Sequence, residues 1–217
     1  MEQFLHEVWI ARTPLVQGLM LTIGLSLFSI IGGSLLGLLG GIGLTYGAPW
    51  LSWPIRFLVD ALRGIPVLVL ILAIFYLLAV AGINFTAVQS GLIALTVFCA
   101  AHMAEILRGA LQAIPEAQTD AARALGLNFP LILGLVLLPQ ALRMIVPVWV
   151  NASVELVKTS TLLSVIGTGE LLFRIQEIIG RNFMTLEFYG LAGLLFFLIN
   201  CAIEHAGKLA ERHLALK

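Results

Sequence analysis

The feature that most constrains this chain is the absence of charge from four long stretches of its sequence. No Asp, Glu, Lys or Arg occurs between Arg12 and Arg56, Arg63 and Glu105, Arg123 and Arg143, or Glu187 and Glu204. Charged residues make up 11% of the chain, whereas roughly a quarter of a soluble domain is charged. Because one membrane-spanning helix needs ~20 apolar residues, the sequence predicts a polytopic membrane protein. A soluble enzyme, a disordered chain and a nucleic-acid-binding protein are excluded on the same grounds.

Glycine and proline divide these stretches into five predicted membrane-spanning helices. Gly47-Ala48-Pro49 interrupts the first stretch and Gly82-Ile83-Asn84 the second, because such residues end helices. The predicted spans cover residues 14–46, 55–81, 86–109, 130–157 and 187–209. The runs are apolar throughout, unlike the alternating strands of a membrane barrel. We therefore expect an all-α membrane protein with a single domain over residues 1–217.

The distribution of basic residues predicts how the chain is oriented. An odd number of spans puts the two termini on opposite sides of the membrane, and Lys and Arg outside the spans favour the cytoplasmic side. If the N-terminus is outside, the inner segments hold the larger share of basic residues, including Arg56, Arg63, Arg108, Arg123 and Arg212. We therefore expect the N-terminus outside and the C-terminus in the cytoplasm.

The segment between the third and fourth spans, residues 110–130, is unlike a lipid-facing helix. It mixes charged side chains with a short stretch of high helix propensity from Gln118 to Leu125. Thr119 is a candidate cap for the start of this helix, and Gly126 is a candidate C′ residue after its end. A helix this short is not stable alone in water. We expect it to pack on a partner surface, with a helix lying on the membrane interface as the alternative.

A second polar segment runs from Glu155 to Arg181, at the outer end of the fourth predicted span. It interleaves hydroxyl and charged side chains with leucine, isoleucine and valine. Polar side chains at membrane depth are tolerated only where they face protein or a water-filled cavity. A polar pathway is one interpretation, and an outer loop with an amphipathic helix is the other.

The inner segment carries a spaced motif. Asp120-Ala121-Ala122 is followed after three residues by Gly126, and after nine more by Val136-Leu137-Leu138-Pro139. This pattern resembles the EAA signature of ATP-binding-cassette (ABC) importer permeases, which reads Glu-Ala-Ala, three residues, Gly, nine residues, Ile-x-Leu-Pro. Asp120 stands for the usual Glu and Val136 for the usual Ile, and both replacements are conservative.

Further motifs resemble the polar amino-acid branch of that family. Arg63-Gly64-Ile65-Pro66 is similar to its Arg-Gly-Thr-Pro, and Glu105-Ile106-Leu107-Arg108-Gly109 to its Glu-x-x-Arg-Gly. Gln118 matches the Gln of its Gln-x-Glu-Ala-Ala. Lys158-Thr159-Ser160-Thr161-Leu162 resembles its Lys-Asp-Thr-Ser-Leu. Thr159 stands where many relatives carry an acidic residue, so the substrate's side chain stays open.

The resemblance implies a fold, a function and a set of partners. The fold is that of type I importer permeases, and the function is to move a polar L-amino acid across the bacterial cytoplasmic (inner) membrane as a multi-pass subunit. The partners are a second permease subunit, identical or related, an ABC ATPase dimer inside and an extracytoplasmic solute-binding protein. The chain has no Gly-x-x-x-x-Gly-Lys-[Ser/Thr] motif, so we expect no enzymatic activity and no cofactor here. ATP and Mg²⁺ would bind the partner ATPase.

Two groups of residues are candidates for function. The ATPase-coupling group is Gln118, Asp120, Ala121, Ala122 and Gly126. Its alanines would allow close approach and its glycine a sharp turn, while the aspartate could serve only to stabilise the helix N-terminus. A zwitterionic substrate must shed water, so its pathway should offer charges and hydroxyls. The substrate-pathway candidates are Arg63, Glu105, Glu155, Lys158, Thr159 and Ser160.

Other interpretations stay open at the level of sequence. Glu155 and Lys158 share a helix face, so they could bind a substrate or only each other, and Arg63 and Glu105 could form a purely structural interhelical pair. A secondary transporter or channel for a small polar solute, driven by an ion gradient, is the alternative function, and it would predict an internal repeat or paired broken helices. A structural subunit of a membrane complex is a third possibility.

Overall fold

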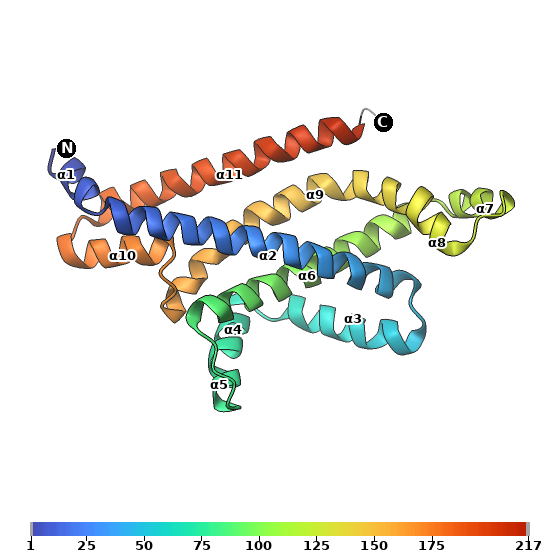
Figure 1. Ribbon diagram of the computed structural model, residues 1–217, viewed down its shortest axis with the longest axis horizontal. Helices are drawn as coiled ribbons and strands as arrows, with labels where there is room; N and C mark the ends of the chain where they lie inside the picture. The colour runs from blue at the N-terminus through green and yellow to red at the C-terminus, as the bar shows by residue number, and fades with distance from the viewer. Residues whose placement is uncertain (1, 216–217) are drawn as a thin grey trace.

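The computed structural model describes residues 2–215, and within that range the regular structure is entirely helical. Four long stretches of helix, α2 (Arg12–Tyr46), α6 (Ala87–Ala113), α9 (Leu138–Thr159) and α11 (Thr185–Ala215), run roughly side by side (Figure 1). The expected all-α class is therefore confirmed. Four helical segments of the described chain are long and apolar enough to span a membrane, or five if one bent pair counts as a span. The number of spans and their orientation stay predictions.

Close packing of α2 on α6 forms the centre of the bundle. Gly33, Gly37 and Gly41 recur every fourth residue on α2, and a Cβ atom on any of them would overlap α6. Small residues let two helix backbones approach closely in a membrane, where dispersion contacts rather than the hydrophobic effect hold helices together. The indole nitrogen of Trp149 on α9 donates a hydrogen bond to the Ser34 hydroxyl of α2 at 2.8 Å, which ties the third long helix to this pair.

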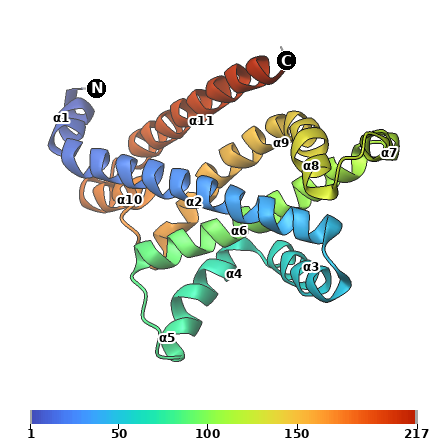
Figure 2. The ribbon, with the colours of Figure 1, turned by 45° about the vertical axis from the view of Figure 1, so that its right-hand side comes forward.

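The second predicted span, residues 55–81, is not one helix, and that expectation is corrected. Helix α3 (Pro49–Gly64) ends before Ile65, and α4 (Val67–Leu72) begins after Pro66 at an angle of 109°. Proline disfavours the helical region for the residue before it, and Ile65 accordingly has φ −87° and ψ 131°. Helix α4 continues through the π-helix η1 (Ala73–Leu77) into α5 (Leu78–Val80) and points away from the bundle (Figure 2).

The fourth predicted span is built from several helical segments. It begins with α8 (Phe129–Ile132), passes through the π-helix η2 (Leu133–Leu137) into α9, and continues into the 3₁₀-helix η3 (Ser160–Ile166). Asn128 caps its start, since its side-chain oxygen accepts the Leu131 amide at 3.2 Å. The π-helix ends at Leu137, two residues before Pro139, which has no amide hydrogen to donate to an α-helical carbonyl.

Short helices close the two ends of the bundle. At one end, α1 (Glu2–Ile10) and α10 (Leu171–Asn182) pack on the first turns of α2 and α11 around a buried cluster that includes Leu15, Ile175 and Phe188. At the other end, α7 (Glu116–Ala124) connects α6 to α8 (Figure 1). Helix α10 buries Leu171, Ile175 and Ile178 and leaves its polar side chains outward, so the amphipathic-helix interpretation describes this part of the second polar segment.

Candidate functional site

Helix α7 begins earlier than the sequence predicted. Ile114 is extended, Pro115 occupies the N-cap position, and Glu116 lies in the first turn. A negative charge is favourable there because the N-terminus of a helix carries partial positive charge. Thr119 is therefore inside the helix, and its predicted role as the N-cap is wrong. Proline is well suited to a helix start, where amide hydrogens have no acceptor within the helix.

The end of α7 is a glycine-dependent turn. Gly126 has φ +78°, its amide donates to the Arg123 carbonyl at 2.8 Å, and the Leu127 amide donates to the Ala122 carbonyl at 3.2 Å. These two bonds form a Schellman motif, in which glycine takes the left-handed conformation. Gly126 is thus the C′ residue that the sequence predicted, and it turns the chain back toward α8.

One face of α7 is fixed to the bundle and the other is free. Ala122 is buried in a cluster with Leu111, Ile114, Ile132 and Leu137. The side chains of Gln118, Asp120 and Ala121 are exposed. Ala122 therefore positions α7 on its own chain and is not on the accessible face. Leu125, the C-cap residue, is 81% exposed. Sequence reasoning did not select it, although a leucine beside a C′ glycine is a visible signal.

Polar contacts also link α7 to its surroundings. The Gln140 side-chain amide, on α9, lies 3.5 Å from the Gln118 carbonyl oxygen and donates to the Val136 carbonyl at 2.8 Å. Asp120 and Arg123 form an exposed ion pair at 3.4 Å, a kind of pair that contributes ~0–1 kcal/mol. A polar cavity of about 450 Å³ separates α7 from the end of α2 and is lined in part by Tyr46.

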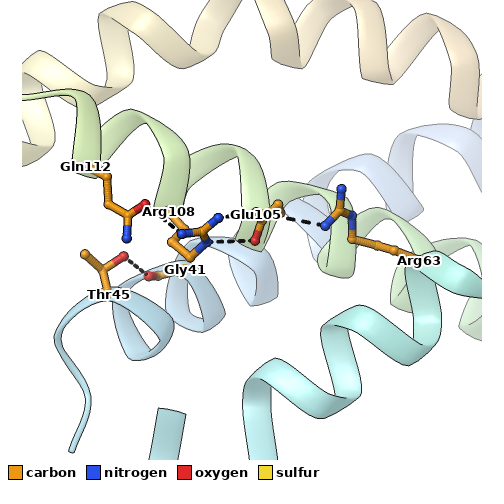
Figure 3. Close-up of polar contacts among 6 residues, drawn as sticks. All are labelled: Gly41, Thr45, Arg63, Glu105, Arg108 and Gln112. Atoms are coloured by element: carbon orange, nitrogen blue, oxygen red, sulfur yellow. Dashed lines mark hydrogen bonds and ion pairs between the residues drawn. The ribbon is translucent and has the colours of Figure 1, made fainter. Parts of the chain in front are cut away.

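The predicted pair of Arg63 and Glu105 belongs to a larger network that also includes Arg108 and Gln112 (Figure 3). Both carboxylate oxygens of Glu105 accept from Arg108, one of them from Nε at 2.9 Å. Arg63 Nη1 lies 4.0 Å from the same carboxylate, so the interhelical pair is the weaker contact. Arg108 also donates to the Gln112 side chain at 2.6 Å. The i,i+3 spacing of Glu105 and Arg108 was the signal for the stronger pair.

The remaining pathway candidates lie elsewhere on the bundle. Lys158 Nζ and Glu155 Oε2 pair at 2.9 Å, and both side chains are largely exposed. The Thr159 hydroxyl donates to the Glu155 carbonyl at 2.9 Å, and the buried Ser160 hydroxyl donates to the Val157 carbonyl at 2.7 Å. Both hydroxyls therefore already donate to backbone carbonyls of their own helical segment. Glu105 and Val148 line the same groove. On α9, Val148 lies about two helical turns before Glu155. The structure therefore does not bring the two charged pairs together.

At the end of the molecule opposite α7, a buried carboxyl group caps a helix. Sequence reasoning did not assign this group to a site. Glu170 is fully buried and caps α10, accepting the amides of Leu172 at 3.0 Å and Phe173 at 2.7 Å. The Thr22 hydroxyl accepts the Leu171 amide at 3.0 Å. Burial raises the pKa of Glu170 to about 7, and hydrogen bonds to its carboxylate from the Leu172 and Phe173 amides and from the Thr22 hydroxyl oppose the rise. An acidic residue before an amphipathic helix is a recognisable N-cap signal.

Among the described residues, no cluster of His, Cys, Asp and Glu could hold a metal ion.

Comparisons with known proteins cover nearly the whole chain. The family model described as "Binding-protein-dependent transport system inner membrane component" matches residues 33–205. The probable amino-acid ABC transporter permease protein YckA of Bacillus subtilis (strain 168) is 31% identical over 87% of this chain and 83% of that protein. The probable glutamine ABC transporter permease protein GlnP of the same organism is 33% identical, over 89% and 90%. A solved structure described as "Crystal structure of an amino acid ABC transporter with histidines" is 28% identical, with a TM-score of 0.88, over 97% and 98%.

Proposed function

This chain belongs to the family of binding-protein-dependent transport system inner membrane components, and from that premise we propose that it is the permease subunit of an ATP-driven importer of a polar L-amino acid. Relatives that carry the names of amino-acid and glutamine ABC permeases support the substrate class. The observation that carries the proposal is α7, a short helix fixed on one face and free on the other, between two long apolar helices. It is suited to pass a movement from a partner into the membrane.

The free face of α7 would be the contact for the ATPase that binds ATP and Mg²⁺. Leu125 would enter an apolar site on that partner, with Gln118, Asp120 and Ala121 around it. Because Ala122 is packed against α6 and η2, a pull on α7 would move the ends of two spans together. Rigid-body transmission of this kind needs a lever that does not bend, and the Schellman turn at Gly126 supplies the stiff return to α8.

Glu155 and Lys158 would offer the charges for the substrate's ammonium and carboxylate groups. An exposed pair of this kind is worth only ~0–1 kcal/mol, so its two members can separate at little cost. The Arg63–Glu105–Arg108 network would hold α3 and α6 together near α7, and it would fix the geometry of the pathway rather than bind the substrate.

The partners and the location follow the same proposal. A second permease subunit would cover the apolar arm from α4 to α5, where Val69, Tyr76, Leu77 and Val80 are exposed. A solute-binding protein would meet the end formed by α1 and α10. The chain would lie in the bacterial inner membrane with its N-terminus outside. Labelling a cysteine at Gln118, but not one at Gln3, with an impermeant reagent in intact cells would contradict that orientation.

Replacement of Leu125 by glutamate tests the proposed contact. The matched control is Leu186→Glu, because Leu186 is 84% exposed at the other end of the molecule while Leu125 is 81% exposed. A charge in an apolar interface is costly, so Leu125→Glu should lose the ATPase on co-purification and should lose amino-acid uptake. Leu186→Glu should retain the ATPase. Full ATPase retention by both variants would mean that α7 is not the coupling element.

The alternative function, a secondary transporter, would need no ATPase. Only one bent helix pair is found in the described part of the chain, whereas broken helices in such transporters come in corresponding pairs. Uptake that persists in cells lacking the ATPase and collapses when the ion gradient is dissipated would favour this alternative.

A further inference from the structure

A groove of about 740 Å³ lies between α2, α9 and α11. Figures 1 and 2 show α11 diverging from α2 as it leaves α10, and the groove lies along this divergence. Ile23, Leu27 and Ile30 line it from α2, and Leu198 and Ala202 from α11. Neither helix α7 nor any of the charged pathway candidates borders it, so it is separate from the sites described above.

The wall of the groove leaves a ligand almost nothing polar to bind. The Ser153 hydroxyl donates to the Trp149 carbonyl at 2.8 Å, and the Trp149 indole donates to Ser34. The remaining hydroxyl is that of Ser26, which is buried and has no partner among the described residues. A polar substrate such as an amino acid would have to leave its own charges unpaired here. The occupant must therefore be apolar.

The depth of the groove follows from the packing of α2 on α6. Gly33 lies against Cys99, Gly37 against Met103 and Gly41 against Leu107, so the two helices run parallel with a constant register. By that register the groove residues of α2, 23–30, lie beside residues 89–96, inside the apolar helix α6. The groove therefore lies between three helical segments that are each long and apolar enough to span a membrane, where the surrounding solvent is lipid.

We propose that this groove is a lipid site that holds one acyl chain of a membrane phospholipid. Its α11 wall runs from Leu198 to Gly207, which is about 14 Å at 1.5 Å per residue. That length is close to one leaflet, half of a hydrocarbon core ~30 Å thick. Near Gly207, α11 lies directly on the Val150 side chain with no space for a Cβ atom, so a chain cannot pass between α11 and α9 at that point.

A helix of a second copy is the competing occupant, and a helix with its side chains is about 10–12 Å across. A polymethylene chain is far thinner and can fill the length of the groove. The inference requires only that the chain lies in a bilayer, so it stands or falls separately from the proposed transport function.

Photolabelling from within the bilayer tests the lipid site. The complex with its ATPase would be reconstituted in vesicles of phosphatidylethanolamine and phosphatidylglycerol that contain a phospholipid with a diazirine on one acyl chain. Leu27 and Ala202 should be labelled more strongly than Phe28 and Phe197, which are exposed but do not line the groove. Equal labelling of the two sets would contradict a specific site, since every lipid-facing surface would then behave alike.

A variant that fills the groove makes the test sharper. Ala202→Trp should lower labelling at Leu27 by about tenfold, which corresponds to ~1.4 kcal/mol, whereas the control Phe197→Trp should leave it unchanged. If Ala202→Trp does not accumulate, Leu27→Trp fills the same space from α2, and labelling is then measured at Ala202. The wild-type pattern decides the question without either variant. A second copy in the groove would overturn the proposal. It would be shown by a disulfide between a cysteine placed at Ile199 and a cysteine placed on a helix of that second copy, together with a groove that the lipid probe does not label.

Discussion

Ala122 and Leu125 lie three residues apart at the end of α7 yet meet opposite environments, since Ala122 is 4% exposed and Leu125 81%. The buried alanine fixes the helix to α6 and η2, and the exposed leucine is left for a partner. This division separates what holds α7 in place from what it can contact. Variants on the two faces should therefore fail in different ways.

Ala122→Asp should destabilise the permease itself. A buried, unpaired charge costs several kcal/mol, so we expect poor accumulation and a lower midpoint of thermal unfolding in detergent. Ala121→Asp is the matched control, because the neighbouring alanine is exposed. It should keep the midpoint and weaken only ATPase attachment. Equal midpoints for the two variants would show that Ala122 is not packed as described.

Gly126→Val should weaken the coupling of ATP hydrolysis to transport, because valine strains the backbone of the turn that ends α7. The left-handed conformation costs a residue with a Cβ roughly 1–2 kcal/mol, and a β-branched side chain is the least suited to it. No atom lies within 4 Å of the position of a Cβ on Gly126, so steric overlap within the chain cannot be the cause. Gly126→Asn, which tolerates this conformation, is the control. Substrate-stimulated ATP hydrolysis should fall for valine and persist for asparagine, and a normal valine variant would refute the role of the turn.

Glu155→Ala and Lys158→Ala should each impair amino-acid uptake and leave ATPase attachment intact. The two charges lie at the end of α9 and pair with each other at 2.9 Å, so either change leaves a lone charge in the proposed pathway. The double variant separates the two roles of the pair. Uptake restored in the double variant would mean that the residues serve only each other, and wild-type uptake in both single variants would remove them from the pathway.

Glu170 should make the stability of the chain depend on pH. Its pKa is about 7 in the folded chain, against an ordinary value of 4.5. The folded state therefore binds the proton more tightly than the unfolded state, so the stabilisation is complete below pH 4.5, declines between pH 4.5 and 7, and is lost above pH 7. The unfolding midpoint should fall over that window in the wild type, with a smaller fall in Glu170→Gln. The same slope in both proteins would assign the effect to other groups.

Some parts of this architecture could be predicted from the sequence because single residues determine them. Gly126 follows a short helical stretch and precedes Asn128 and Pro130, which leaves few conformations other than a C′ turn. Runs without charge located the long helices. The break at Ile65 could also have been predicted from Pro66, but the surrounding residues are apolar and were interpreted as one continuous span.

Other features depend on packing that no local pattern encodes. Ala121 and Ala122 are equivalent in sequence, and only the position of α7 against α6 and η2 decides which of them is buried. The divergence of α11 from α2, and with it the groove, results from crossing angles between helices distant in the chain. Glu105 could have been paired with Arg108 from spacing alone, whereas the 4.0 Å separation from Arg63 required coordinates.

The most direct test of the central claim is amino-acid uptake into vesicles that hold the permease and its ATPase, with the solute-binding protein supplied on the side opposite ATP. We predict accumulation of a radiolabelled polar L-amino acid that requires hydrolysable ATP and all three components, and that is lost with Leu125→Glu. Accumulation driven by a proton or sodium gradient in vesicles without ATP and ATPase would contradict the account.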